Sequence, residues 1–316
     1  MSDTPLLREG ARGEAVRVLH RRLRLAGFDP NDIDEYGAGT VAAVRAFQTA
    51  RKLRIDGICG PETWGALEES AFSLGDRLLC RRAPMLRGDD VVDLQTRLNA
   101  LGYDAGRSDG IFGPQTEDAL VAFQRDAAVA VDRICGPETI AALARLGAPG
   151  TGSVAATRER DALRRGALRF DGVRIVVSGG SAGPAGSLAE ALRARGAAAS
   201  VESGDGDPVG IAARVNELGA DLFVHLTESE QNLTQCAFFE GISMRSEGGF
   251  RVATGISAAL AGIGVAVADP VGRTSRLLRE TRMPAVICEL ADPAHPAVAD
   301  AIADGIHRTF ANTTPG

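Results

Sequence analysis

The chain contains 316 residues, of which 35 are lysine or arginine and 41 are aspartate or glutamate, so its formal net charge is −6. With 45% hydrophobic and 24% charged residues it has the composition of a globular protein, and its length predicts two or three domains. The acidic balance argues against a nucleic-acid partner, because binding to phosphates requires a basic face.

The sequence also bears on the compartment and on the membrane. No apolar run approaches the roughly 18 residues that a membrane-spanning helix needs, so we expect no membrane insertion. The first residues lack the apolar stretch of a signal peptide, and the five cysteines show no CxxC spacing, which argues against a disulfide framework or a cysteine zinc site. We therefore expect a cytoplasmic protein. The cysteines are Cys59, Cys80, Cys135, Cys236 and Cys288.

An internal repeat covers the first half of the chain. The segment DGICGPET at 56–63 returns as DRICGPET at 132–139, and TVAAVRAFQ returns as TEDALVAFQ. An apolar pattern upstream repeats as well, and together these matches indicate a tandem duplication. The upstream residues are Val16, Leu19 and Leu23 in the first copy and Val91, Leu94 and Leu98 in the second.

Each copy is predicted to fold as three short helices, in domains at 6–72 and 80–147. The upstream apolar residues recur at helical spacing, and both runs end at a glycine that suits a helix C-terminus. The second helix carries the TVAAVRAFQ or TEDALVAFQ segment. Pro61 and Pro137 fall near the first turn of the third helix, where proline is favoured.

These motifs, LxxxLxxxGF/Y, TxxAVxxFQ and DGIxGPxT, resemble the peptidoglycan-binding domain type 1, a three-helix module found beside many cell-wall hydrolases. The second copy carries the turn pattern twice, as DGIFGPQT and DRICGPET, whereas the first copy has DEYGAGT in its middle. The resemblance implies a groove that contacts cell-wall stem peptide or glycan. The alternative is that the duplicated module serves as a scaffold or as a platform for a protein partner.

The second half has a different organisation. A segment rich in Gly, Ala, Ser, Thr and Arg at 148–170 is typical of a linker. Beyond it, apolar runs alternate with amphipathic stretches, which predicts an α/β domain at 171–312. The fold class is therefore α plus α/β, with two tandem three-helix domains followed by an α/β domain. The expected strands are 173–177, 198–201, 221–226, 235–239 and 285–290, and the expected helices are 187–195, 209–218, 249–261 and 296–310.

Three segments of this half resemble the zinc-dependent N-acetylmuramoyl-L-alanine amidases of the type 3 family. VRIVVSGGSAG is similar to the first strand with its DPGHGG motif, ADLFVHLTES to the strand with the second histidine, and RMPAVICEL to the strand that ends in the catalytic glutamate. Two peptidoglycan-binding copies ahead of such a domain, with SLGDRLL between them and GRTSRLLRETRMP near the end, resemble the CwlM-type amidase-like proteins of actinobacteria.

The resemblance implies a zinc site made by His, Glu and His, where the metal activates a water and a glutamate moves its proton. In this sequence the first histidine falls on Ser181 and the aspartate of the same motif on Ser178. The second histidine falls on Thr227, and the catalytic glutamate is matched by Glu289. A hydroxyl is a much poorer zinc ligand than an imidazole. We therefore expect no cofactor and a pseudo-amidase in which Glu289 is inactive.

The zinc glutamate has no counterpart, because Glu190, the acidic residue that follows the shortened loop, lies too far along its helix. His225 lies two residues before Thr227, on the same face of the strand. The alternative is an amidase with rearranged ligands such as His225 and Glu190, which would need zinc. The other histidines, His20, His295 and His307, do not lie at ligand spacing.

A serine hydrolase is a rival interpretation. GGSAG at 179–183 fits the nucleophile-elbow pattern and follows a strand, and Ser181, Asp292 and His295 occur in the order of a triad. Against it, no earlier strand could supply an oxyanion loop, and Asp292 is only three residues from His295. We favour the interpretation that these glycines remain from a shortened metal loop.

We therefore expect a non-catalytic, cytoplasmic regulator or adaptor of peptidoglycan synthesis. The resemblance implies that such proteins act by binding other proteins, notably the UDP-N-acetylglucosamine enolpyruvyl transferase, under the control of a serine/threonine kinase. The tail ANTTPG offers Thr313 and Thr314 as phosphosites, because added negative charge can dock on the arginines of a partner. A further alternative is a sensor whose repeats bind peptidoglycan precursors.

Overall fold

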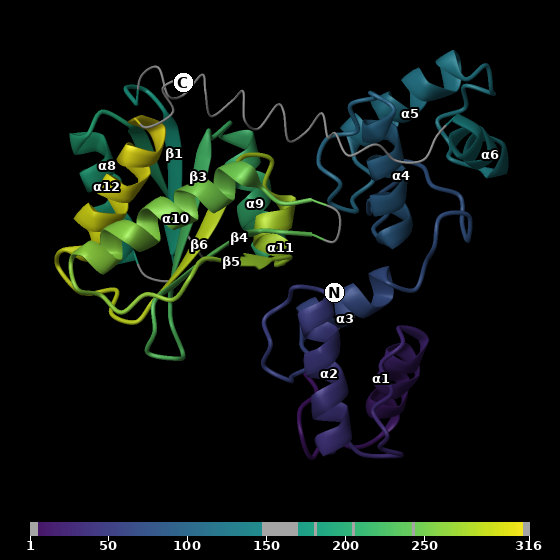
Figure 1. Cartoon of the computed structure of the whole chain (residues 1–316), viewed down its shortest axis with the longest axis horizontal. Coiled ribbons are helices and arrows are strands. Elements are labelled where there is room, and N and C mark those ends of the chain that lie inside the picture. Colours follow the sequence, from purple (N-terminus) through teal and green to yellow (C-terminus); the bar gives the residue numbers. More distant parts are fainter. Residues whose placement is uncertain (1–5, 147–169, 180–181, 204–205, 242–243, 312–316) are drawn as a thin grey trace. The chain divides into compact units, whose positions relative to one another are not determined.

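The computed structural model divides into two compact units, one formed by residues 1–155 with 241–244 and the other by residues 156–240 with 245–316. The first unit is helical and the second is α/β, which confirms the predicted fold class (Figure 1). Within the described ranges, no helix combines the length and the apolar character needed to cross a membrane. The structure describes residues 6–146, 170–179, 182–203, 206–241 and 244–311.

Each helical copy contains three helices, as the repeat predicts (Figure 1). The third helix of each copy begins at its proline, Pro61 or Pro137, whose missing N–H would have no partner at a helix start. A glycine with positive φ, Gly27 or Gly102, follows the first helix and lets the chain turn away. The helices are α1 (Glu14–Leu25), α2 (Ala38–Ala50) and α3 (Pro61–Glu69) in the first copy, and α4 (Asp89–Ala100), α5 (Pro114–Asp126) and α6 (Pro137–Leu146) in the second.

Each copy has its own hydrophobic core, and the two cores are built alike. Phe28 and Phe47 in the first copy, and Tyr103 and Phe123 in the second, pack edge to face with ring centres 5.6 and 5.5 Å apart. The repeating apolar residues predicted to form the cores are fully buried, which confirms the helical pattern. They are Val16, Leu19, Leu23, Val91, Leu94 and Leu98.

A buried glutamine organises the loop ahead of the third helix. In the second copy the side-chain amide of Gln124 donates to Asp132 Oδ1 (2.9 Å) and to Thr139 Oγ1 (3.1 Å). It also donates to the backbone carbonyl of Ile134 (3.0 Å). We call this set a glutamine knot, and it explains structurally why the FQ and DGIxGPxT motifs recur together. The same knot joins Gln48 to Asp56, Ile58 and Thr63 in the first copy, and Gln95 to Asp109, Ile111 and Thr116 in the second.

The first copy has a histidine where the second has its Gln95 knot. His20 Nε2 lies 2.8 Å from Thr40 Oγ1, and the Thr40 hydroxyl donates to Asp32. Because the Thr40 hydrogen is used in that bond, His20 must donate from Nε2, which leaves Nδ1 without a proton. His20 is buried, and Nδ1 has no hydrogen-bond partner among the described residues. The histidine therefore makes a poorer buried network than the glutamine does.

The α/β unit contains a six-stranded sheet in the order β2-β1-β3-β6-β4-β5. Strands β2, β1, β3 and β6 are parallel, whereas β4 runs antiparallel to β6 and parallel to β5. The strands are β1 (Arg174–Gly179), β2 (Ala198–Ser203), β3 (Leu222–Glu228), β4 (Gln235–Phe239), β5 (Val271–Arg273) and β6 (Ala285–Leu290). The helices are α8 (Ala182–Ala194), α9 (Pro208–Glu217), α10 (Glu247–Gly262), α11 (Arg276–Glu280) and α12 (Val298–Ala311).

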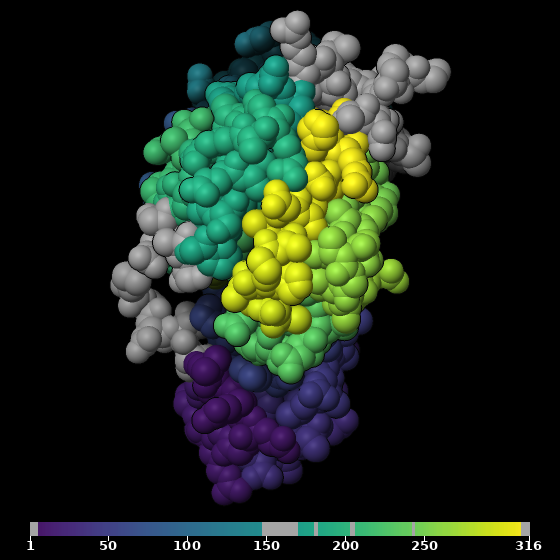
Figure 2. All heavy atoms as spheres, turned by 90° about the vertical axis from the view of Figure 1, so that its left-hand side faces the viewer, coloured from purple at the N-terminus to yellow at the C-terminus, as the bar shows by residue number. Residues whose placement is uncertain are grey.

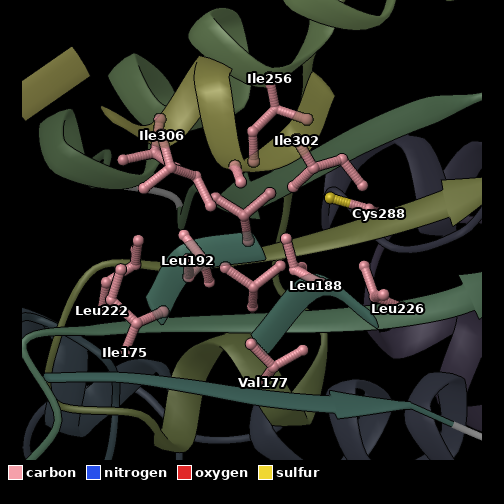
Figure 3. Close-up of a cluster of buried hydrophobic side chains, with 14 of the residues drawn as sticks. Ile175, Val177, Leu188, Leu192, Leu222, Leu226, Ile256, Cys288, Ile302 and Ile306 are labelled. Carbon is pink, nitrogen blue, oxygen red and sulfur yellow. The ribbon is translucent and has the colours of Figure 1, made fainter. Parts of the chain in front are cut away.

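Helices cover both faces of this sheet. Helices α8, α10 and α12 share one face, and Figure 2 shows α12 in yellow between α8 in teal and α10 in green. Leu188, Ile256 and Ile302 from these helices meet the sheet in one apolar core (Figure 3). Right-handed crossovers place α9 on the opposite face, where Arg214 of α9 pairs with Glu202 of β2. Short α11 packs against α9.

Two glycines set the crossing of α10 and α12. A Cβ on Gly305 would lie 2.6 Å from the carbonyl oxygen of Gly255, and a Cβ on Gly255 would lie 2.3 Å from Thr309 Oγ1. Both distances are shorter than any side chain tolerates, so glycine is required at each position. The close approach lets α12 close the core over the sheet.

All five predicted strands and all four predicted helices of this unit are present. The bounds of β4 and β6 are those predicted; Thr234 and Glu240 flank β4, and Pro284 precedes β6. Helix α8 begins earlier than predicted, since GPAG is accommodated in its first turns. The sequence did not indicate β5 or α11, which contain 3 and 5 residues and are too short to show a period.

Candidate active site

Three residues predicted to mark a former zinc site lie on the α9 face of the sheet, near the carboxyl ends of its strands. Ser178 is in β1, Thr227 in β3 and Glu289 in β6. Their neighbours in the sequence belong to the core on the other face, as alternation along a strand requires. The carboxyl ends of parallel strands are where α/β sheets commonly bind ligands. Ser181 lies outside the described residues.

Ser178 and His225 form a hydrogen-bonded pair across β1 and β3. They are partners in register, and Ser178 Oγ lies 2.8 Å from His225 Nδ1. Ser178 is fully buried, and burial lowers the pKa of His225, so the imidazole is neutral at pH 7. The hydroxyl that replaces the aspartate of the DPGHGG motif is therefore engaged inside the sheet.

Glu289 is held by an arginine that the sequence did not reveal. Arg273 of β5 donates from Nη1 to Glu289 Oε1 at 2.5 Å and from Nη2 to Glu289 Oε2 at 3.1 Å. Nη2 also donates to Gln235 Oε1 at 3.0 Å. Gln235 and Thr227 flank Glu289 as its register partners on β4 and β3. We call Arg273, Glu289 and Gln235 the arginine clamp.

The clamp changes what Glu289 can do. The side chains of Arg273 and Glu289 are only 16% and 21% exposed, so their attraction is weakly screened by water. A bidentate guanidinium–carboxylate contact is among the stronger hydrogen-bonded pairs in proteins. Each oxygen of Glu289 accepts a hydrogen bond from Arg273, so the guanidinium uses one lone pair on each oxygen and competes with any water for the carboxylate.

The residues present do not fit a zinc ion. Thr227 offers a hydroxyl at the position where the sequence resemblance predicts an imidazole, and Glu289 is ion-paired with Arg273. No group of three His, Cys, Asp or Glu side chains within the described part of the chain is arranged to hold a metal.

The structure also separates the rearranged ligands considered above. Glu190 is an exposed residue of α8, the helix that packs on the core face of the sheet. His225 alternates with Val224 and Leu226, which belong to that core, so it lies on the opposite face. The hypothesis that His225 and Glu190 share a zinc ion is therefore wrong, because the sheet stands between them.

The hydrolase triad fails on geometry as well. His295 Nδ1 accepts a hydrogen bond from the Ala297 amide at 3.3 Å, whereas a triad histidine donates from Nδ1 to its aspartate. Asp292 accepts from the Ala294 amide at 3.1 Å in the same turn. Both side chains therefore stabilise the segment ahead of α12.

Of the other histidines, His20 is buried in the first helical copy and His307 packs edge to face on Phe170.

The sequence analysis named Glu289, Thr227, Ser178 and His225 as site candidates but did not indicate Arg273. The ion pair joins residues on β5 and β6, which are not neighbours in the sheet, and no spacing in the sequence indicates it. The proposed phosphosites Thr313 and Thr314 lie outside the described residues.

Comparison with known proteins adds three findings. The putative peptidoglycan binding domain matches residues 12–67 and 87–143. The N-acetylmuramoyl-L-alanine amidase CwlM of Mycobacterium tuberculosis is 35% identical over 359 aligned positions, which cover 96% of this chain and 88% of that protein. The amidase CwlL of Bacillus licheniformis is 32% identical over 171 positions, 46% of this chain and about half, 47%, of its own length.

Among solved structures, the N-acetylmuramoyl-L-alanine amidase of Clostridium difficile 630 aligns with 44% of this chain and 95% of its own chain. Its sequence identity is 17% and its TM-score is 0.36.

Proposed function

Since the chain belongs to the N-acetylmuramoyl-L-alanine amidase family that includes CwlM, we propose that it is a member without hydrolytic activity, acting as a cytoplasmic regulator or adaptor of peptidoglycan synthesis. The observation that carries the proposal is the arginine clamp on Glu289. Thr227 at the position of a histidine ligand supports it independently.

The chemistry of the family explains why the clamp matters. Hydrolysis of the muramoyl–alanine amide requires a metal-bound water and a carboxylate that removes its proton. In this chain the carboxylate of Glu289 is paired with a guanidinium, and the hydroxyl of Thr227 is a weak metal ligand. Restoring one group alone would leave the other defect in place.

A regulator needs only a difference in affinity. If the chain binds the active state of a partner better than the inactive state, it raises the active fraction without any chemistry of its own. We propose the UDP-N-acetylglucosamine enolpyruvyl transferase as that partner. A serine/threonine kinase would tune the interaction by adding charge at Thr313 or Thr314.

The test uses the full chain and the purified transferase. We expect the transferase rate to change on addition of the chain, and a Glu289→Gln variant to act equally well. A Thr313→Ala/Thr314→Ala variant tests the tail, which we expect to lose both phosphorylation and its regulatory effect. In parallel, the chain with added zinc should release no new alanine amino termini from peptidoglycan. Release that disappears in Glu289→Gln would overturn the proposal.

A second candidate function rests on the helical copies. Both match the peptidoglycan-binding family, and the Gln48 and Gln124 knots hold the same loop in each copy. The repeats would then bind a cytoplasmic precursor, and this binding would alter the interaction of the chain with its partner. Titration calorimetry with UDP-muramyl pentapeptide tests this directly, and no measurable heat would count against a sensor while leaving the adaptor proposal intact.

A further inference from the structure

Two cysteines lie side by side in the α/β unit, on the face of the sheet opposite the arginine clamp. Cys236 of β4 and Cys288 of β6 are register partners on antiparallel strands, and their Sγ atoms are 3.7 Å apart. Both thiols are free and fully buried. Figure 3 shows the sulfur of Cys288 among apolar side chains, with Ile302 beside it. Nothing in the site described above uses this pair.

The backbone already has the geometry of a cross-link. Directly opposite residues on antiparallel strands have Cα atoms about 4.5–5.5 Å apart, within the roughly 4.4–6.8 Å that a disulfide spans. The two sulfurs are already in contact at 3.7 Å, and they must approach to about 2.05 Å for a disulfide to form.

We propose that Cys236 and Cys288 are a redox modification site that closes to a disulfide when the protein meets a hydroperoxide. The Cys236 thiolate attacks one peroxide oxygen, the O–O bond breaks, and a sulfenic acid and hydroxide result; the hydroxide takes up the proton that the Cys236 thiol released and becomes water. The Cys288 sulfur then attacks the Cys236 sulfur, the S–S bond forms and a second water leaves with the thiol proton. Two thiols and one hydrogen peroxide thus give one disulfide and two waters, and a dithiol reductant reverses the link.

The surroundings make the two thiols unequal. The contact with Cys288 lowers the pKa of Cys236 against the effect of burial, whereas the same contact and burial raise the pKa of Cys288. Ser257 of α10 faces Cys236, and its buried hydroxyl has no other hydrogen-bond partner among the described residues. These groups favour a thiolate at Cys236, which assigns it the first step and leaves Cys288 to resolve the sulfenic acid.

The link would form directly beside the arginine clamp. Gln235 precedes Cys236, Glu289 follows Cys288, and Arg273 binds both Gln235 and Glu289. A covalent bond between β4 and β6 therefore fixes the two strands that carry the clamp. The inference does not depend on the proposed function, since it needs only the two thiols and an oxidant.

The experiment uses the full chain in a Cys80→Ser background, because Cys80 is only partly buried and would react first. The native protein is exposed to hydrogen peroxide, quenched, denatured in an alkylating agent and digested without reduction. We expect the thiol count to fall by two and a cross-linked peptide pair containing Cys236 and Cys288 to appear. Dithiothreitol should restore both thiols, and the oxidised protein should unfold at a higher denaturant concentration.

Single variants separate the two roles. Cys288→Ser keeps a hydrogen-bonding group beside Cys236 and should leave Cys236 as a sulfenic acid that dimedone traps, whereas Cys236→Ser should leave Cys288 unmodified. Circular dichroism of each variant shows whether the α/β unit is folded, and if a variant is not, the peptide map of the background protein decides alone. The proposal is overturned if both cysteines stay alkylatable, or become sulfinic acids without a cross-link, while the protein remains folded.

Discussion

Gln124 in the second helical copy and Arg273 in the α/β unit each stand at the centre of a polar network, but the two networks do different things. Gln124 holds the loop ahead of α6, and its equivalent Gln48 does the same in the first copy. Arg273 instead pairs with the carboxylate of Glu289 at the candidate site. The first network holds a loop of the fold in place, and the second engages a carboxylate that we propose has lost a catalytic role.

The difference between the two networks shows what the motifs of each region indicate. In the repeats, FQ and DGIxGPxT recur because buried hydrogen bonds require them, so their presence reports a folded module rather than a ligand. In the sheet, Ser178 is hydrogen-bonded to His225 and Glu289 is paired with Arg273, so both side chains are engaged inside the protein. The fold alone therefore does not show that the site is active.

The largest expected effect comes from removing a glutamine knot. In Gln48→Leu the bonds to Asp56, Thr63 and the Ile58 carbonyl are lost, and the buried amide of Gly57 loses its acceptor, Gln48 Oε1. We expect the first copy to be destabilised by about 3 kcal/mol, because each unpaired buried group costs about 1–3 kcal/mol. Trp64, the single tryptophan of the chain, is buried in this copy and reports its unfolding by fluorescence in urea.

The matched control for the knot is Gln124→Leu, which makes the same change in the second copy. It should leave the Trp64 transition where it is. If Gln48→Leu leaves that transition unchanged, the knot is not a structural element and the contrast with the clamp disappears.

The next largest effect tests the clamp. Arg273→Ala leaves Glu289 partly buried without its counter-charge, and we expect a loss of about 2 kcal/mol from the α/β unit. The double variant with Glu289→Gln should recover much of that loss, which a double-mutant cycle by circular dichroism in urea measures. Additive losses in the two single variants would show that the pair is not coupled.

A smaller effect distinguishes the two helical copies through the pH dependence of their stability. Burial, and then Arg24, lower the pKa of His20, while Asp32 and Asp34 oppose the shift. The folded copy therefore holds this proton less readily than the unfolded chain, so its stability is full above the ordinary histidine pKa of about 6.5 and falls as the pH drops below it. We expect the urea midpoint of the first copy to fall between about pH 6.5 and pH 5, because the unfolded chain takes up this proton more readily than the folded copy.

His20→Gln, which introduces the residue of the second copy, should remove this acid sensitivity from the Trp64 transition. The same pH titration in urea decides the matter. An unchanged pH profile in the variant would assign the sensitivity to another group.

The smallest effect concerns the link between the copies. Arg51 of the first copy makes two hydrogen bonds to Asp89 of the second, at 2.7 and 2.8 Å, and the side chains are 15% and 33% exposed. We expect Arg51→Ala to shift the Trp64 transition by about 0.5 kcal/mol, and less at high salt, as for other partly exposed pairs. A salt-independent shift would point to lost packing instead of lost charge.

Local patterns predicted the fold well, whereas the contacts that decide function were not predictable from them. Apolar runs were enough to locate β4 and β6. The partner of Glu289 depends on β5, a strand of 3 residues without a period, and on the reach of an arginine across β4. The pairing of Cys236 with Cys288 likewise depends on β4 lying antiparallel to β6, which no sequence spacing encodes. By contrast, alignment of the two repeats shows directly that His20 of the first copy stands where the second copy has Gln95.

The measurement that tests the central claim most directly is the zinc content of the purified chain after exposure to zinc and desalting. We predict less than about a tenth of a zinc ion per chain, since a structural or catalytic zinc site retains its metal through such treatment. Close to one zinc ion per chain, lost when Thr227 is replaced by alanine, would contradict the account and restore the amidase interpretation.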